Sequence, residues 1–188
     1  MKKKLLLCIL ILSVLSLITA CGDKGENSSS KTGSGEVISK ADISFSTSSD
    51  GKNIVDNRTS GYKFSYNDKK VKMNNSGSCI SFVPSDKKDK KEKNLFLSIT
   101  ETDPDVVMDL GKQIKEANKD SIQIEQIKLG DTKTKAEHLI ITNDKKIIHD
   151  YYIISSDKKG WYIEIKCPSK YNKKYMTIFE EILDSLEF

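Results

Sequence analysis

The sequence predicts an α+β domain, an α/β/α sandwich in which two helices cover an antiparallel sheet. Three observations lead to this prediction. Short alternating segments joined by turns fill most of residues 51–188, as in an antiparallel sheet. Two other segments, 104–119 and 171–186, repeat apolar residues at helical spacing. The hairpin over 134–156 is apolar on both faces, so its strands need a cover on each side.

The N-terminal segment reads as a lipoprotein signal peptide, residues 1–20. Lys2-Lys3-Lys4 precede an apolar run, 5–17, that is too short and wrongly flanked for a membrane span. Ile18-Thr19-Ala20-Cys21 then resembles the lipobox of bacterial lipoproteins. We therefore expect Cys21 to carry acyl chains such as palmitate and to hold the protein on the outer face of the cell membrane. The alternative is an ordinary secretory signal with a chance cysteine.

Charge gives little support for a nucleic-acid partner. The net charge of the whole chain is +4, but residues 1–20 contain three lysines and no acid. The mature chain therefore has 28 basic and 27 acidic residues, so we expect no nucleic acid to bind. Arg58 is the only arginine, which weighs against bidentate phosphate recognition. The Lys-, Asn- and Ile-rich composition indicates a low-GC Gram-positive source.

Residues 21–50 are predicted to be a flexible tether. The stretch 22–35 contains no apolar residue and cannot bury surface. Val37, Ile38, Ile43 and Phe45 interrupt this polarity and are compatible with a loose strand. We expect one globular domain to follow, at 51–188.

The first half of this domain contains three predicted strands and a charged loop. Tyr62, Phe64 and Tyr66 alternate within 61–66. Cys79–Val83 is a short strand that Pro84 closes, and 94–100 places Leu95, Leu97 and Ile99 on one face. Between these two strands, 86–93 is a run of charges. Such a run is usually a solvated loop tip, and a contact to anionic surfaces is the alternative.

A helix is predicted over 104–119. Asp103-Pro104-Asp105 supplies an N-cap, a proline for the first turn and an acid beside the helix N-terminus. The apolar stripe is Val107, Leu110, Ile114 and Ala117. Ser169 is predicted to cap the last helix, whose stripe is Tyr171, Tyr175, Ile178, Phe179, Ile182 and Leu186.

Four antiparallel strands are predicted between the helices. The strand 122–129 slips in its alternation, which indicates a bulge. The segments 134–142 and 145–156 form a hairpin over Asn143-Asp144. The strand 161–167 is the last of the four, and Pro168 ends it.

The two histidines are the least ordinary pattern. A two-residue turn at Asn143-Asp144 pairs positions whose numbers sum to 287, which places His138 opposite His149. Two imidazoles at this distance can bind one metal ion together, or can influence the protonation of each other near neutral pH. No third ligand is evident, so two ordinary strand histidines are the alternative.

Cysteines and acids supply no further catalytic pattern. Cys79 and Cys167 either form a disulfide, which an extracytoplasmic compartment permits, or are small buried hydrophobes. Glu164 and Asp150 lie in apolar strands, where an exposed or salt-bridged acid is the ordinary interpretation. The chain has no glycine-rich phosphate loop and no Gly-x-Ser-x-Gly elbow. We therefore expect no cofactor and no enzymatic activity.

The order of elements resembles the PsbP-like fold, which many small bacterial lipoproteins share. The resemblance rests on 61–66, on Gly160-Trp161-Tyr162-Ile163-Glu164-Ile165 with the following Pro168, and on 179–188. Asn67 stands where such domains often have a proline. The resemblance implies a non-enzymatic binding or assembly module with a protein partner. A solute-binding lipoprotein and a small envelope enzyme remain the alternatives.

Overall fold

The computed structural model describes residues 43–142 and 146–188. The predicted signal peptide, Cys21 and most of the predicted tether lie outside the described residues. No described helix is long and apolar enough to cross a membrane. In chain order the elements are β1 Ile43–Thr47, β2 Asn53–Asn57, β3 Tyr62–Tyr66, β4 Val71–Asn75, β5 Cys79–Pro84, η2 Asp89–Lys91, β6 Phe96–Thr102, α2 Pro104–Ala117, β7 Ile122–Leu129, β8 Thr134–Ile141, β9 Ile147–Ser155, β10 Gly160–Pro168, η3 Ser169–Tyr171 and α3 Asn172–Asp184.

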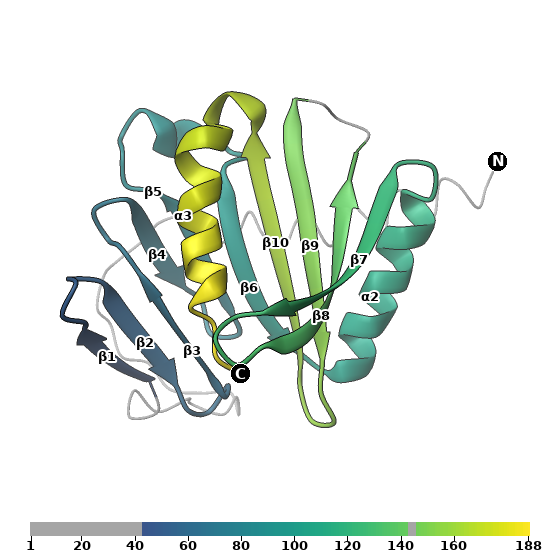
Figure 1. The fold of residues 1–188 in the computed structure, drawn as a ribbon, viewed down its shortest axis with the longest axis horizontal. Helices are drawn as coiled ribbons and strands as arrows, with labels where there is room; N and C mark the ends of the chain where they lie inside the picture. Colours follow the sequence, from purple (N-terminus) through teal and green to yellow (C-terminus); the bar gives the residue numbers. More distant parts are fainter. Residues whose placement is uncertain (1–42, 143–145) are drawn as a thin grey trace, which may run out of the picture. The chain divides into compact units, whose positions relative to one another are not determined.

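Two antiparallel sheets form the domain (Figure 1). The larger has seven strands in the order β4-β5-β6-β10-β9-β8-β7, and the smaller has the order β1-β2-β3. The C-terminus is tied to the small sheet, because Lys63 and Glu187 exchange backbone hydrogen bonds of 2.9 and 2.8 Å. The predicted α+β class with an antiparallel sheet and two helices is confirmed.

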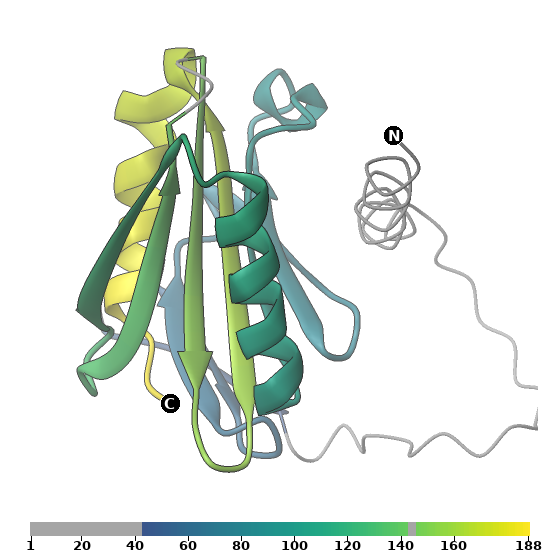
Figure 2. The same cartoon turned by 90° about the vertical axis from the view of Figure 1, so that its right-hand side faces the viewer.

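The two helices lie on opposite faces of the larger sheet (Figure 2). Along β10, Ile163 and Ile165 point into the core that α3 covers, whereas Tyr162 packs with the residues beneath α2. Alternate residues of a strand point to opposite faces, so both faces of β10 are covered. The predicted α/β/α layering is therefore confirmed.

The face beneath α3 holds the main core. Twenty-three buried residues form this apolar cluster, whereas the apolar cluster beneath α2 has three, within the described part of the chain. The small sheet contributes to the same core, since the ring of Phe64 meets the ring of Phe82 edge-on at 5.4 Å. On the opposite face, α2 packs against β9 and β10.

The start of α2 follows the signals in the local sequence, whereas the predicted start of α3 needs a correction. Pro104 starts α2 after the N-cap residue Asp103, as predicted, but the Asp103 side chain makes no capping hydrogen bond. The helix ends at Ala117, before the predicted end at 119. Ser169 does not cap α3. It begins the short η3 turn, and α3 starts three residues later at Asn172.

The structure corrects the predicted domain boundary and the predicted bulge. Ile43–Thr47 forms β1 and pairs with β2, so the folded unit begins before residue 51. Ile43 packs against the core, whereas the other four residues of β1 are exposed. The strand β7 pairs with β8 without interruption from Ile122 to Leu129, so it has no bulge. Its slip in alternation reflects a strand whose side chains are mostly exposed.

The register of β8 and β9 also differs from the prediction. His138 lies opposite Tyr152, and Ile141 lies opposite His149, so paired positions sum to 290 instead of 287. The predicted turn residues Asn143 and Asp144 lie outside the described residues. Both faces of this hairpin are apolar and covered, so the alternation alone favours neither register. The predicted pairing of His138 with His149, which was deduced from an assumed turn, is therefore wrong.

Candidate functional site

Lysines gather at one end of the domain, which we call the lysine-rich end. It comprises the β3–β4 turn (67–70), the β5–β6 loop (85–94), Lys146 and the connection from β10 into α3 (168–174). These segments contain eleven lysines and four acidic residues. The rest of the described chain contains 13 basic and 18 acidic residues. The charge of the domain is therefore segregated, about +7 at this end and −5 elsewhere.

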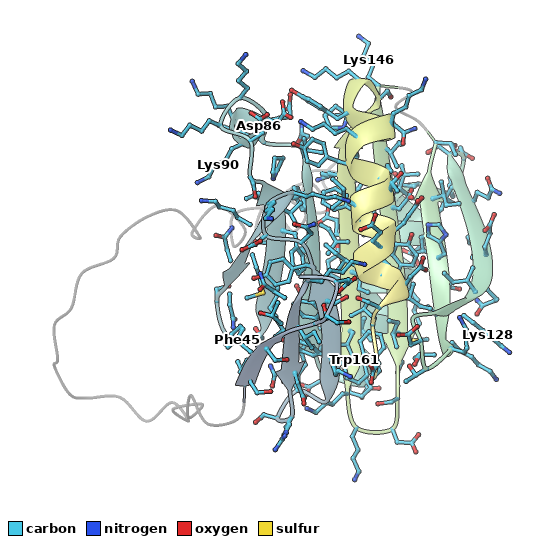
Figure 3. The ribbon with its side chains drawn as sticks, turned by 60° about the vertical axis from the view of Figure 1, so that its left-hand side comes forward. Phe45, Asp86, Lys90, Lys128, Lys146 and Trp161 are labelled. Carbon is cyan, nitrogen blue, oxygen red and sulfur yellow. The ribbon has the colours of Figure 1, made fainter. Side chains whose placement is uncertain are left out.

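Hydrogen bonds and ion pairs hold the four segments together. Ser85 Oγ donates to the Asp68 carbonyl at 2.8 Å, which joins the first two. Lys174 Nζ lies 2.6 Å from Asp89 Oδ2, and Lys170 Nζ lies 3.3 Å from Glu92. The Ser169 N–H donates to the Lys146 carbonyl at 2.8 Å. Segments about one hundred residues apart therefore form one surface, where Figure 3 labels Asp86, Lys90 and Lys146.

The central ion pair stays charged around neutral pH. Hydrogen bonds from Lys174 and Tyr175 lower the pKa of the Asp89 carboxyl. The same bond to Asp89 raises the pKa of the Lys174 ammonium. Burial, with the neighbouring Asp89, raises the pKa of Tyr175 to about 12, so its hydroxyl keeps the proton that it donates to Asp89. Asp89, Lys174 and Tyr175 are therefore joined by charged hydrogen bonds that fix the start of α3 against the β5–β6 loop.

A shallow cavity of about 340 Å³ opens on this end. Its lining includes three lysines and is formed by Lys69, Lys70, Ser85, Asp86, Lys174, Tyr175 and Ile178. Lys70 and Lys174 are each held by an acid, because Nζ of Lys70 lies 3.4 Å from Glu181 and Nζ of Lys174 lies 3.7 Å from Asp86. Ammonium groups around an open cavity attract anions such as phosphate as point charges.

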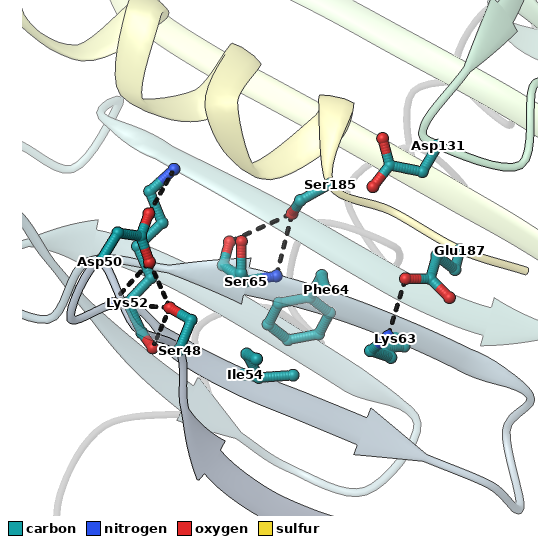
Figure 4. Close-up of a pocket in the computed structure, with 10 residues that line it drawn as sticks. All are labelled: Ser48, Asp50, Lys52, Ile54, Lys63, Phe64, Ser65, Asp131, Ser185 and Glu187. Atoms are coloured by element: carbon teal, nitrogen blue, oxygen red, sulfur yellow. Dashed lines mark hydrogen bonds and ion pairs between the residues drawn. The ribbon is translucent and has the colours of Figure 1, made fainter.

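A second groove, of about 250 Å³, lies between the small sheet and the C-terminal segment (Figure 4). Each of its two lysines is paired with an acid, since Lys63 Nζ lies 2.8 Å from Glu187 Oε1 and Lys52 Nζ lies 3.8 Å from Asp50 Oδ2. Ser185 Oγ accepts from the Ser65 N–H at 2.9 Å and donates to the Ile182 carbonyl at 2.8 Å. These polar groups join parts of the fold, so the groove is a weaker candidate than the lysine-rich end.

His149 belongs to a buried polar cluster on the α2 face. Its Nε2 lies 2.8 Å from Glu164 Oε1, and Lys166 Nζ lies 3.2 Å from the same oxygen. Burial opposes ionisation of Glu164, but the hydrogen bond with His149 and the charge of Lys166 outweigh it and lower its pKa. Burial and the Glu164 charge raise the pKa of Tyr151 and of Tyr162. Glu164 is salt-bridged as predicted, but it is buried, not exposed.

His138 lies on the other face of the sheet. Its ring stacks on Tyr152 at 4.3 Å, and its Nε2 lies 3.5 Å from Asp150 Oδ2. The structure therefore does not bring His138 and His149 together, because the shift of the register places them on opposite faces. Among residues 43–142 and 146–188, no group of three His, Cys, Asp or Glu side chains could hold a metal ion.

The structure does not bring Cys79 and Cys167 together either. Cys79 lies opposite Thr100, which places it on the α2 face, whereas Cys167 belongs to the core beneath α3. They also lie at different heights on strands that are not neighbours. Cys167 is fully buried, and burial raises the pKa of its thiol to about 11. It fills the role of a small hydrophobe, which was the alternative prediction.

Sequence reasoning identified only the loop 86–93 of the lysine-rich end. The signals for the other parts were present as the paired lysines Lys69-Lys70 and Lys173-Lys174, each at the start of an element. Their meeting depends on tertiary contacts. The sequence also contained a signal for the Glu164 cluster. Its residues occupy alternating positions of two adjacent strands, 149 and 151 on β9 and 162, 164 and 166 on β10.

Comparisons with known proteins add little. No family model matches the chain, and no curated protein matches it. Among solved structures, the chain is similar to the solution structure of cyanobacterial PsbP (CyanoP) from Synechocystis sp. PCC 6803. The identity is 13%, the match covers 82% of this chain and 97% of that chain, and the TM-score is 0.41. At this TM-score the likeness carries no argument about function.

Proposed function

We propose that the protein is a lipid-anchored, extracytoplasmic binding or assembly module without enzymatic activity of its own. Cys21 is its anchor in the outer face of the cell membrane. The support for the anchor is the basic segment, the apolar run and the lipobox-like Ile18-Thr19-Ala20-Cys21. Two acyl chains make such an anchor durable.

The observation that carries the binding role is the segregation of charge. A domain with a lysine-rich end and an acidic remainder presents two surfaces of opposite sign. It can therefore hold an anionic partner at one end while a second partner, which we propose is an envelope protein, contacts the remainder. Electrostatic complementarity of this kind orients partners and speeds their encounter.

The anchor is tested with Cys21→Ala in intact cells labelled with a fatty acid. We expect unprocessed precursor and no lipid label, because the acylated sulfur is gone. Ser76→Ala, a change at an exposed turn, is the matched control and retains label. A labelled and normally matured Cys21→Ala protein contradicts the anchor.

The binding role is tested by cross-linking in intact cells followed by purification of the protein. We expect one defined envelope protein with the wild-type chain and less of it with Cys21→Ala, because that precursor lacks the acyl chains that hold the domain beside its partner. A co-purified small solute without a protein partner would contradict the assembly role and favour a solute-binding lipoprotein.

A further inference from the structure

The lysine-rich end relies on lysine alone. All eleven of its cations are lysines, and Arg58, the one arginine of the chain, lies outside it. An arginine fork demands a partner of matching geometry, whereas an ammonium group acts as a point charge on a flexible stem. This end therefore suits a surface with many interchangeable anionic groups better than one ligand of fixed shape.

Eight of these eleven lysines fall into two kinds. Lys70, Lys170 and Lys174 are held by acidic side chains and fix the segments in place. Lys87, Lys88, Lys90, Lys91 and Lys93 are exposed, and their ammonium groups make no ion pair within the described residues. Figure 3 shows Lys90 on the outside of the loop. The second kind keeps its charge available to a partner.

We propose that the lysine-rich end lies against the anionic phospholipid headgroups of the membrane that holds the anchor. The proposal rests on the proposed function, because it requires the protein to be anchored there. Clusters of lysines beside an anchor are attracted to anionic lipids, and the attraction decays within a Debye length, about 8 Å at physiological ionic strength. The acidic remainder of the domain is repelled, so the two effects act together on orientation.

The chain is long enough for this arrangement. Ile43 lies at the end of the small sheet away from the 67–70 turn, since it pairs with Asn57 while Tyr66 leads into that turn. Residues 22–42 span at most about 70 Å when extended. The longest strands, β9 and β10, have nine residues each, which corresponds to about 30 Å. The anchor therefore lets the lysine-rich end reach the membrane and keeps its local concentration high.

The test uses the full lipidated chain reconstituted into vesicles of two compositions. One is phosphatidylcholine alone, and the other is phosphatidylcholine mixed with phosphatidylglycerol. Lysines are acetylated with a water-soluble reagent and quantified by peptide mass spectrometry. Relative to Lys112 and Lys158, which are exposed, lie outside the lysine-rich end and are kept in every variant, we expect about fivefold slower labelling of the lysine-rich end on anionic vesicles only. High salt should abolish the difference.

Two matched variants locate the effect. The first replaces Lys87, Lys88, Lys90 and Lys91 by Gln, and the second replaces Lys119, Lys128, Lys133 and Lys135, which are exposed and lie outside the lysine-rich end. Both remove four charges, but only the first should lose the protection of Lys69, Lys93 and Lys173. Equal loss in both variants would mean that net charge alone acts, and it would overturn the proposal.

Other outcomes separate this proposal from the anchor. Equal labelling on both vesicles, with the protein still floating on neutral vesicles, overturns the docking and leaves the anchor intact. Failure to float on neutral vesicles contradicts the anchor itself. If added glycerol phosphate protects these lysines on neutral vesicles, the lysine-rich end binds a soluble phosphate. If only added envelope proteins protect them, it binds a protein. Either result overturns the membrane assignment.

Discussion

The two faces of the seven-stranded sheet are built differently, although a helix covers each. Beneath α3, twenty-three buried residues and the small sheet form one continuous apolar core. Beneath α2, the buried apolar cluster of the described residues consists of Val107, Leu139 and Ile153, and the Glu164 cluster lies on the same face. Stability should therefore depend mainly on apolar burial at the α3 face, and on close fit and charge at the α2 face.

The largest expected effect is on the α3 face. Phe179 is fully buried, so Phe179→Ala should lower the free energy of unfolding by about 3–5 kcal/mol through lost burial and the cavity left behind. Urea denaturation followed by circular dichroism measures it. Phe45→Ala is the matched control, because Phe45 is 63% exposed, and we expect a change below about 0.5 kcal/mol. Similar losses in both variants would show that the α3 face is not the principal core.

A smaller effect is expected where α2 meets the sheet. A Cβ on Gly160 would lie 2.5 Å from Val107 Cγ1 and 3.0 Å from the Asp103 carbonyl oxygen. Gly160→Ala should therefore cost about 1–3 kcal/mol through overpacking. Val107→Ala removes the nearer atom, so the double variant should lose less stability than the sum of the two single changes. Additive losses would mean that α2 is not seated against Gly160.

The contrast between the faces also explains what the sequence could predict. Periodicity alone identified both helices and most strands, because apolar spacing of 3.6 and of 2 is a local signal. It did not identify β2 and β4. The sequence of β4, Val71-Lys72-Met73-Asn74-Asn75, is mostly polar. These strands depend on pairing with neighbours, which no local pattern records.

The candidate site was less predictable than the fold. The β8–β9 register could not be read from a hairpin with two apolar faces, so the placement of His138 and His149 followed an assumed turn. Glu164 was read as an ordinary strand acid, because its partners come from the next strand and from its own. The lysine-rich end needed contacts such as Lys174 with Asp89, which lie far apart in the chain.

The smallest effect, and the one that tests the role of charge on the α2 face, is expected from Glu164→Gln. The amide keeps the shape of the side chain and can still accept from His149 and Lys166, but it lacks the negative charge. We expect a loss of about 1 kcal/mol near neutral pH, as a charged hydrogen-bond acceptor becomes a neutral one. Urea denaturation of both proteins across acid pH measures the difference.

The sign of the pH dependence follows from the lowered pKa of Glu164 in the folded protein. The ionised carboxylate stabilises the folded state, fully so at pH above its ordinary pKa of 4.5. As the pH falls through the lower pKa of the folded state, the carboxylate is protonated and this stabilisation is lost. The wild-type protein should therefore approach the stability of Glu164→Gln in acid, whereas Phe179→Ala should stay destabilised there. A Glu164→Gln difference that does not change with pH would show that shape, and not charge, is what Glu164 contributes to this face.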